Sequence, residues 1–127
     1  MRAPAVGEHL AAVVPDGESL LQYWDGLLYR CRPDGTLLAG DESCRRLTGY
    51  APAELVLSAI VHPDDRPMVQ QNWFGAAQPY RLTYRILTAT GEVKWVWDQG
   101  RLLPSGEREG ALTDVTAQKQ IEESLRQ

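Results

Sequence analysis

The chain has 127 residues, of which 43% are apolar and 24% are charged, a balance that is typical of a folded domain and excludes a disordered tail. A chain of this length can bury one hydrophobic core. The net charge is −4, and the 13 basic residues are scattered among 17 acidic ones. The sequence therefore offers no positive surface for a phosphate backbone, and nucleic acid is not an expected partner.

Two features of the chain indicate a reduced, cytoplasmic setting. The two cysteines, Cys31 and Cys44, are too few for a disulfide framework. The apolar run over residues 10–14 follows Glu8 and ends at Pro15, so it is too short for an export signal or a membrane span. We therefore expect a cytoplasmic location and no direct contact with a membrane.

The first half of the chain predicts two short strands followed by short helices. Residues 1–17 are rich in Gly, Pro and Ala and are expected to be flexible, and residues 18–23 are expected to form a capping helix. Residues 27–32 and 36–39 have the pattern of two strands joined by the turn Pro33-Asp34-Gly35. Helix starts follow at Asp41 or Ser43, at Pro52 and at His62-Pro63-Asp64-Asp65, and Gly49 is expected to end the first helix.

The second half changes from a helical period to a period of two. Tyr80, Leu82, Tyr84 and Ile86 alternate with polar residues, which predicts a strand with one buried face. On the next strand Val93, Trp95 and Trp97 alternate with Lys94, Val96 and Asp98. Residues 109–115 predict a third strand, and residues 116–127 predict an exposed helix. The whole order predicts an α+β fold in which a five-stranded sheet is covered by helices on one face.

The segments that punctuate this order resemble the PAS family with its PAC motif. They share the order and spacing of that family from about Leu27 onward. The matching segments are Leu28-Tyr29-Arg30-Cys31-Arg32, residues 44–47, Thr48-Gly49-Tyr50, Glu54-Leu55, His62-Pro63-Asp64-Asp65-Arg66, Tyr84-Arg85-Ile86, Gly91-Glu92-Val93-Lys94-Trp95-Val96 and Asp114-Val115-Thr116.

The resemblance implies an antiparallel sheet in the strand order 2-1-5-4-3, with short helices packed across it and a small pocket between them. It places a PAS/PAC sensor domain at residues 18–115 and the start of a linker helix at residues 116–127. It also implies a homodimer joined to an output domain, either a histidine kinase or a diguanylate cyclase, or to further PAS units. Only six residues separate Leu55 from His62. In similar sequences a longer segment at this position forms one wall of the pocket, so this short wall suggests a small pocket or none.

Six side chains form the candidate pocket for a small ligand. Aromatic residues among them could line a site for a planar molecule, although plain core packing is the favoured interpretation of each one taken singly. The candidates are Leu47, Trp73, Tyr84, Ile86, Trp95 and Trp97.

No cofactor is evident in the sequence, and we expect neither haem, flavin nor a metal ion. His62 precedes Pro63 at a helix start, where capping is simpler than ligation of haem iron. Cys44 lacks the motif that surrounds the flavin-adduct cysteine of light-sensing PAS relatives, so it is interpreted as a buried core thiol. Asp64 and Asp65 are interpreted as helix caps, since no partner base or nucleophile accompanies them.

Asp114, Val115 and Thr116 are the candidate relay, because they join the last strand to the final helix. Asp114 can accept hydrogen bonds from nearby donors, and Thr116 is expected to cap the helix. Two functions remain open at this point. The first is a sensor that detects a small ligand and passes a conformational change to an output domain, and the second is a ligand-free module for dimerisation. A third function, an enzyme or a covalent photoreceptor, is the weakest, because it would require a catalytic constellation or a coloured protein and the sequence shows no such constellation.

Overall fold

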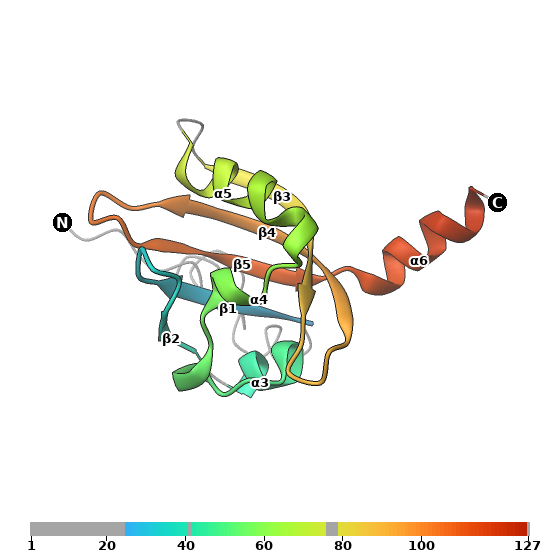
Figure 1. The fold of residues 1–127 in the computed structure, drawn as a ribbon, viewed down its shortest axis with the longest axis horizontal. Helices are drawn as coiled ribbons and strands as arrows, with labels where there is room; N and C mark the ends of the chain where they lie inside the picture. The colour runs from blue at the N-terminus through green and yellow to red at the C-terminus, as the bar shows by residue number, and fades with distance from the viewer. Residues whose placement is uncertain (1–24, 41, 76–78, 127) are drawn as a thin grey trace, which may run out of the picture.

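The computed structural model describes residues 25–40, 42–75 and 79–126. Within them, five strands form one antiparallel sheet in the order β2-β1-β5-β4-β3 (Figure 1). The strands are β1 (Gly26–Cys31), β2 (Leu37–Ala39), β3 (Tyr80–Leu87), β4 (Val93–Leu102) and β5 (Arg108–Asp114). The predicted α+β fold and its strand order are therefore confirmed.

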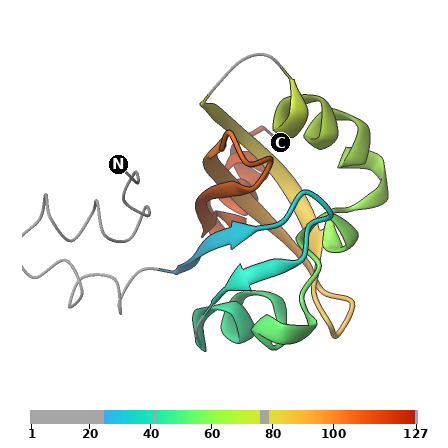
Figure 2. The same cartoon turned by 90° about the vertical axis from the view of Figure 1, so that its left-hand side faces the viewer.

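Short helices between β2 and β3 cover one face of this sheet (Figure 2). They are α3 (Glu42–Thr48), η1 (Pro52–Glu54), α4 (Leu57–Ile60), η2 (Pro63–Asp65) and α5 (Arg66–Phe74). The last helix, α6 (Thr116–Leu125), follows β5 directly and extends away from the sheet (Figure 1). No helix in the described part of the chain is long and apolar enough to cross a membrane. The capping helix expected at residues 18–23 lies outside the described residues.

The face of the sheet beneath the short helices, called here the inner face, carries the core. Alternate residues of β3 point to it, and Tyr84 and Ile86 are fully buried there. Val96 of β4 and Leu112 of β5 join them from the neighbouring strands. The helices contribute Leu47, Leu57, Val69 and Trp73 to the same core.

The segment between Leu55 and His62 contains a helix that the sequence pattern did not predict. This is α4, whose Leu57 and Ile60 are buried in the core. The N–H of Leu57 donates to the carbonyl of Gly35 at 2.8 Å, and Val61 forms an isolated bridge with Ile86. The short wall is therefore held at both ends by backbone contacts with the sheet and its first turn.

Two of the expected helix caps have different outcomes. His62 caps η2 as predicted, since its Nδ1 accepts the N–H of Asp64 at 3.1 Å. The prediction that Asp65 is a cap is wrong, because its side chain makes no capping bond. The Asp65 carboxylate instead binds Arg85 on β3, with contacts of 2.7 Å to Nη2, 3.0 Å to Nε and 2.8 Å to the backbone N–H. This pair holds the start of α5 against the sheet.

Candidate functional site

A buried carboxylate lies at the centre of the inner face. Asp98 of β4 is fully buried, and its two oxygens accept three hydrogen bonds from side chains. Oδ1 accepts the hydroxyl of Tyr29 at 2.7 Å, while Oδ2 accepts the hydroxyl of Tyr84 at 2.8 Å and the indole N–H of Trp73 at 3.0 Å. Donors from β1, β3 and α5 therefore converge on one acid, so Asp98 ties three elements of the core together.

Burial controls the protonation of this cluster. Burial raises the pKa of Asp98, against the lowering effect of its three donors and of Arg108. Burial and the Asp98 charge together raise the pKa of Tyr29, Tyr80 and Tyr84. All three hydroxyls consequently keep their protons at neutral pH and remain available as donors.

Two glycines make room for the tyrosines. The hydroxyls of Tyr29 and Tyr80 lie 2.6 Å apart, with both rings above the inner face of β4 and β5. A Cβ added to Gly110 would lie 2.6 Å from the Tyr29 hydroxyl and 2.5 Å from the carbonyl oxygen of Gln99. A Cβ added to Gly100 would lie 2.6 Å from the Tyr80 hydroxyl. Only glycine permits these close approaches.

A buried cation lies beside the carboxylate cluster. Arg108 of β5 is fully buried, and its guanidinium lies 3.7 Å from the centroid of the Trp73 ring. None of its three guanidinium nitrogens has a hydrogen-bond partner among the described residues. Trp73 therefore connects the two charges, since its N–H binds Asp98 and its ring face carries Arg108.

The six predicted pocket residues do not share one face of the sheet. Leu47, Trp73, Tyr84 and Ile86 lie together in the core beneath the helices. Trp95 and Trp97 point to the opposite, outer face, where they stand across from Arg85 and Thr83 of β3. The apolar character of Val93, Trp95 and Trp97 suggested that these alternate residues of β4 point to the core. The alternate residues that point to the core instead include Val96 and the polar Asp98. Only four of the six predicted residues can therefore line one pocket in the core.

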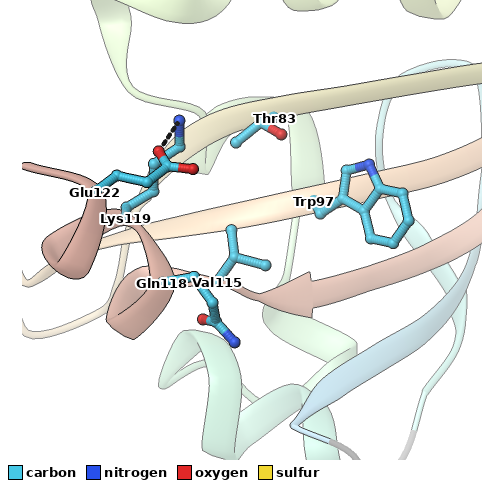
Figure 3. A pocket seen from close by; sticks show the side chains of 6 residues that line it. All are labelled: Thr83, Trp97, Val115, Gln118, Lys119 and Glu122. Carbon is cyan, nitrogen blue, oxygen red and sulfur yellow. Dashed lines mark ion pairs between the residues drawn. The ribbon is translucent and has the colours of Figure 1, made fainter. Parts of the chain in front are cut away.

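A groove lies on the outer face beside α6 (Figure 3). Its volume is about 240 Å³, and it is lined by Thr83, Trp97, Val115, Gln118, Lys119 and Glu122. Trp97 is 38% exposed. Lys119 and Glu122 form an ion pair at 3.3 Å on the helix side of the groove (Figure 3).

The junction between β5 and α6 is closed by a small hydrogen-bond network. Asp114 Oδ1 accepts the N–H of Thr116 at 3.0 Å and its hydroxyl at 2.6 Å. Thr116 Oγ1 accepts the backbone N–H of Trp95 at 3.0 Å, and the N–H of Val115 donates to the carbonyl of Trp95 at 2.8 Å. The N-cap position is Val115, which makes no side-chain capping bond, so the expected Thr116 cap is not formed. Asp114, one residue earlier, binds the first N–H of the helix, and Thr116 ties the helix start to β4.

The remaining candidates have simpler surroundings. Cys44 is a buried thiol, as predicted, and its Sγ lies 3.5 Å from the carbonyl oxygen of Tyr50. Asp64 is exposed and lies 3.9 Å from the His62 imidazole. Among residues 25–40, 42–75 and 79–126, no group of three or more His, Cys, Asp or Glu side chains could hold a metal ion.

Sequence reasoning missed the polar centre of the site, namely Asp98, Arg108 and Tyr29. Two signals could have indicated it. An acid in the middle of a ten-residue strand is unusual, and Gly100 and Gly110 stand opposite one another in the register of β4 and β5. Paired inward glycines indicate large side chains approaching from neighbouring strands.

Comparisons with known proteins give a consistent result. A family model described as the PAS fold matches residues 37–112. The chain is 33% identical over 88 residues to a blue-light-activated histidine kinase from Brucella abortus. This match covers 62% of the chain and 18% of the relative. The chain is also 31% identical over 113 residues to a methyl sulfide methyltransferase-associated sensor from Methanosarcina acetivorans. That match covers 77% of the chain and 11% of the relative. The chain thus spans less than a fifth of the length of these relatives.

A solved structure shares the fold over most of the chain. It is a sensory box histidine kinase/response regulator from Burkholderia thailandensis, with a TM-score of 0.67 and 24% sequence identity. The match covers 86% of this chain and 91% of that chain. At this identity, the likeness shows the arrangement of helices and strands.

Proposed function

Because the chain belongs to the PAS fold family, we propose that it is the signal-sensing input domain of a longer signal-transduction protein. PAS domains are sensory modules that are usually not catalytic. In this proposal residues 18–115 form the sensor and residues 116–127 begin the linker to an output domain. The kinase relatives favour a histidine kinase as that output domain, with a diguanylate cyclase as the alternative.

The observation that carries this proposal is the junction at Asp114. The hydrogen bonds of Thr116 join the start of α6 to β4 as well as to β5. A shift of β4 relative to β5 would therefore break or reorient the first turn of α6. A helix that leaves the sheet at such a point can change its angle or register when the sheet repacks, and this biases a two-state linker.

The decisive experiment fuses residues 1–127 to the catalytic core of a histidine kinase and measures autophosphorylation. Asp114→Ala removes the acceptor of the Thr116 N–H and hydroxyl at the start of α6, and we expect it to change kinase activity while the circular dichroism spectrum stays unchanged. Asp34→Ala is the matched control, because Asp34 Oδ1 also accepts the N–H of the residue two positions later, Thr36, at 2.8 Å. Equal activity of the two variants, or unfolding of Asp114→Ala, would contradict the proposal.

A second function is favoured by the exposed apolar stripe of α6. Ile121 is 60% exposed and Leu125 is 81% exposed, and α6 has no buried residue in this structure. Such a stripe fits a coiled-coil contact with a second copy of the chain, as in a ligand-free dimerisation module. Sedimentation velocity tests it. We expect a dimer that the double change Ile121→Ser and Leu125→Ser converts to monomer, whereas a wild-type monomer would count against this function.

The absence of haem and flavin stays a prediction. Relatives of the chain include kinases that are named as blue-light-activated. An absorbance spectrum of the purified protein tests the prediction, because a bound chromophore of either kind would give a visible band. A colourless protein is the expected result.

A further inference from the structure

The guanidinium of Arg108 is a charge without a hydrogen-bond partner. The side chain is fully buried, and Nε, Nη1 and Nη2 all lack an acceptor among the described residues. A guanidinium keeps its charge throughout the pH range in which proteins are folded. Buried ionised groups are normally paired and hydrogen-bonded, so the part of the chain that the structure describes leaves these N–H groups short of acceptors.

Neighbouring acids do not supply this acceptor. The oxygens of Asp98 accept from Tyr29, Tyr84 and Trp73, and neither oxygen makes a hydrogen bond with Arg108. Glu109, the next residue along β5, points to the outer face, where it pairs with Arg101 at 2.6 Å.

The cross-strand neighbours of Arg108 do not supply it either. These neighbours are Cys31 on β1 and Leu102 on β4. Burial raises the pKa of the Cys31 thiol, which keeps it neutral and a weak acceptor. The Tyr80 hydroxyl faces the guanidinium, and because Tyr29 donates to Asp98, Tyr80 donates to Tyr29 at 2.6 Å and keeps the capacity to accept one N–H of Arg108. One hydroxyl oxygen can satisfy at most one of the five guanidinium N–H groups.

The surroundings of Arg108 are aromatic on the helix side. The Trp73 ring lies 3.7 Å from the guanidinium carbon, and the centroid of the Phe74 ring lies 5.5 Å from it. Phe74 is 51% exposed and is the last residue of α5. A half-exposed aromatic ring at the end of α5 therefore lies beside the buried guanidinium.

We infer that this core binds a small monocarboxylate with an apolar body, whose carboxylate is held by the guanidinium of Arg108. The inference rests on the proposed sensory function and names the class of signal that the domain detects. A planar carboxylate matches the fork of guanidinium N–H groups with two parallel hydrogen bonds. The Asp98 charge in the same core disfavours a dianion such as phosphate, and the aromatic rings favour an apolar body.

The position of Arg108 also connects such a ligand to the junction at α6. Trp73 touches Arg108 with its ring and Asp98 with its N–H. Asp98 lies on β4, the strand whose Trp95 N–H is bonded to Thr116. A ligand that moves the guanidinium thus acts on the strand that holds the first turn of α6.

Nuclear magnetic resonance of the 127-residue chain tests the inference through the Nε–Hε signal of Arg108. Octanoate and benzoate are the probes, octan-1-ol and benzyl alcohol are their neutral matches, and sodium chloride is the inorganic control. We expect at least one of the two carboxylates to shift this signal in a saturable manner, while its alcohol does not. Arg108→Met is expected to weaken binding by at least about 30-fold, as for the loss of a buried charged partner.

Arg81→Met is the matched control, because Arg81 is exposed on β3 and the chemical change is the same. Its affinity for the carboxylate is expected to match that of the wild type. If Arg108→Met fails to fold, Arg108→Lys, which keeps the charge and loses the fork, replaces it.

Three results would overturn the inference. They are an Arg108 signal that neither carboxylate moves, an equal shift with chloride, and unchanged carboxylate affinity in the folded Arg108 variant. None of them bears on the Asp114 experiment, which measures kinase output, so a failure of this inference is distinguishable from a failure of the proposed function.

Discussion

Asp98 offers a sharp test of how the polar core is held together. Asp98→Leu removes every acceptor from the centre of the cluster and keeps the branched shape of the side chain with bulkier methyl groups, whereas Asp98→Asn keeps one carbonyl oxygen. If that oxygen takes the place of Oδ2, it still accepts from Trp73 and Tyr84. The new amide N–H can then donate to the Tyr29 hydroxyl, which can donate in turn to Tyr80.

The expected magnitudes follow from this count of hydrogen bonds. In Asp98→Leu the Trp73 N–H and the Tyr84 hydroxyl lose their acceptor, while Tyr29 keeps Tyr80 as a partner. Two buried donors without acceptors cost about 2–6 kcal/mol together, at about 1–3 kcal/mol each. We expect Asp98→Asn to cost only about 1 kcal/mol. Both variants lose the Asp98 charge near Arg108, so their difference reports the lost acceptors together with the larger volume of Leu.

Equilibrium unfolding in urea measures both variants. With a dependence of about 2 kcal/mol per M, the Leu variant should unfold about 1–3 M earlier than wild type, and the Asn variant about 0.5 M earlier. Superimposable unfolding curves for the two variants would refute the reasoning, because they would mean that Trp73 and Tyr84 do not depend on an acceptor at position 98.

Other residues give predictions of known sign. Burial raises the pKa of Asp98 above 3.8, so above this pH the folded state holds a proton that the unfolded chain releases. Urea unfolding should therefore show that wild type loses stability relative to Asp98→Asn as the pH rises from about 4. Arg85 lowers the pKa of Asp65, so Asp65→Ala should cost about 1–2 kcal/mol at neutral pH, and this cost should shrink as pH falls below 3.8. Gly110→Ala should cost about 1–3 kcal/mol by thermal unfolding through its clash with Tyr29, whereas Gly91→Ala, with φ 87° and no atom near its Cβ, should cost about 1–2 kcal/mol from backbone strain alone.

The order of elements was predictable because turn residues mark it clearly. Gly35 and Gly49 have φ of 92° and 81°, and each stands where the pattern placed a turn or a helix end. The change from helical to alternating period before Tyr80 marks the first strand of the final three. The strand order could not be read from these local signals, and the resemblance to the PAS family supplied it.

The polar core was not predictable from periodicity, because its residues break the rule on which periodicity rests. On β4 the tryptophans occupy the outer face, while Asp98 and the partly buried Lys94 share the parity of the inner face. Each of these inward polar groups is satisfied by a distant partner. Lys94 Nζ donates to the carbonyl of Leu47 at 3.0 Å at the end of α3, and Asp98 depends on donors from three elements. Long-range partners of this kind appear only when the chain is folded.

Helix α4 and the role of Asp65 were missed for a related reason. Leu57 and Ile60 form only one turn, which is too short to show a helical period, and this turn is stabilised by burial. Asp65 stands at a helix start, where capping is the usual role, but Arg85 on β3 competes for its carboxylate with two charged contacts.

Amide hydrogen exchange at Thr116 tests most directly whether the β5–α6 junction is a separately adjustable element, as a relay requires. The exchange rates of individual amides would be compared in wild type and Asp114→Ala. We expect Thr116 to exchange about tenfold faster in the variant, with Trp95 affected through its bond to Thr116 and the amides of β1 and β3 unchanged. Faster exchange spread across the whole sheet, or no change at Thr116, would contradict the proposal that this junction carries the signal from the sheet to α6.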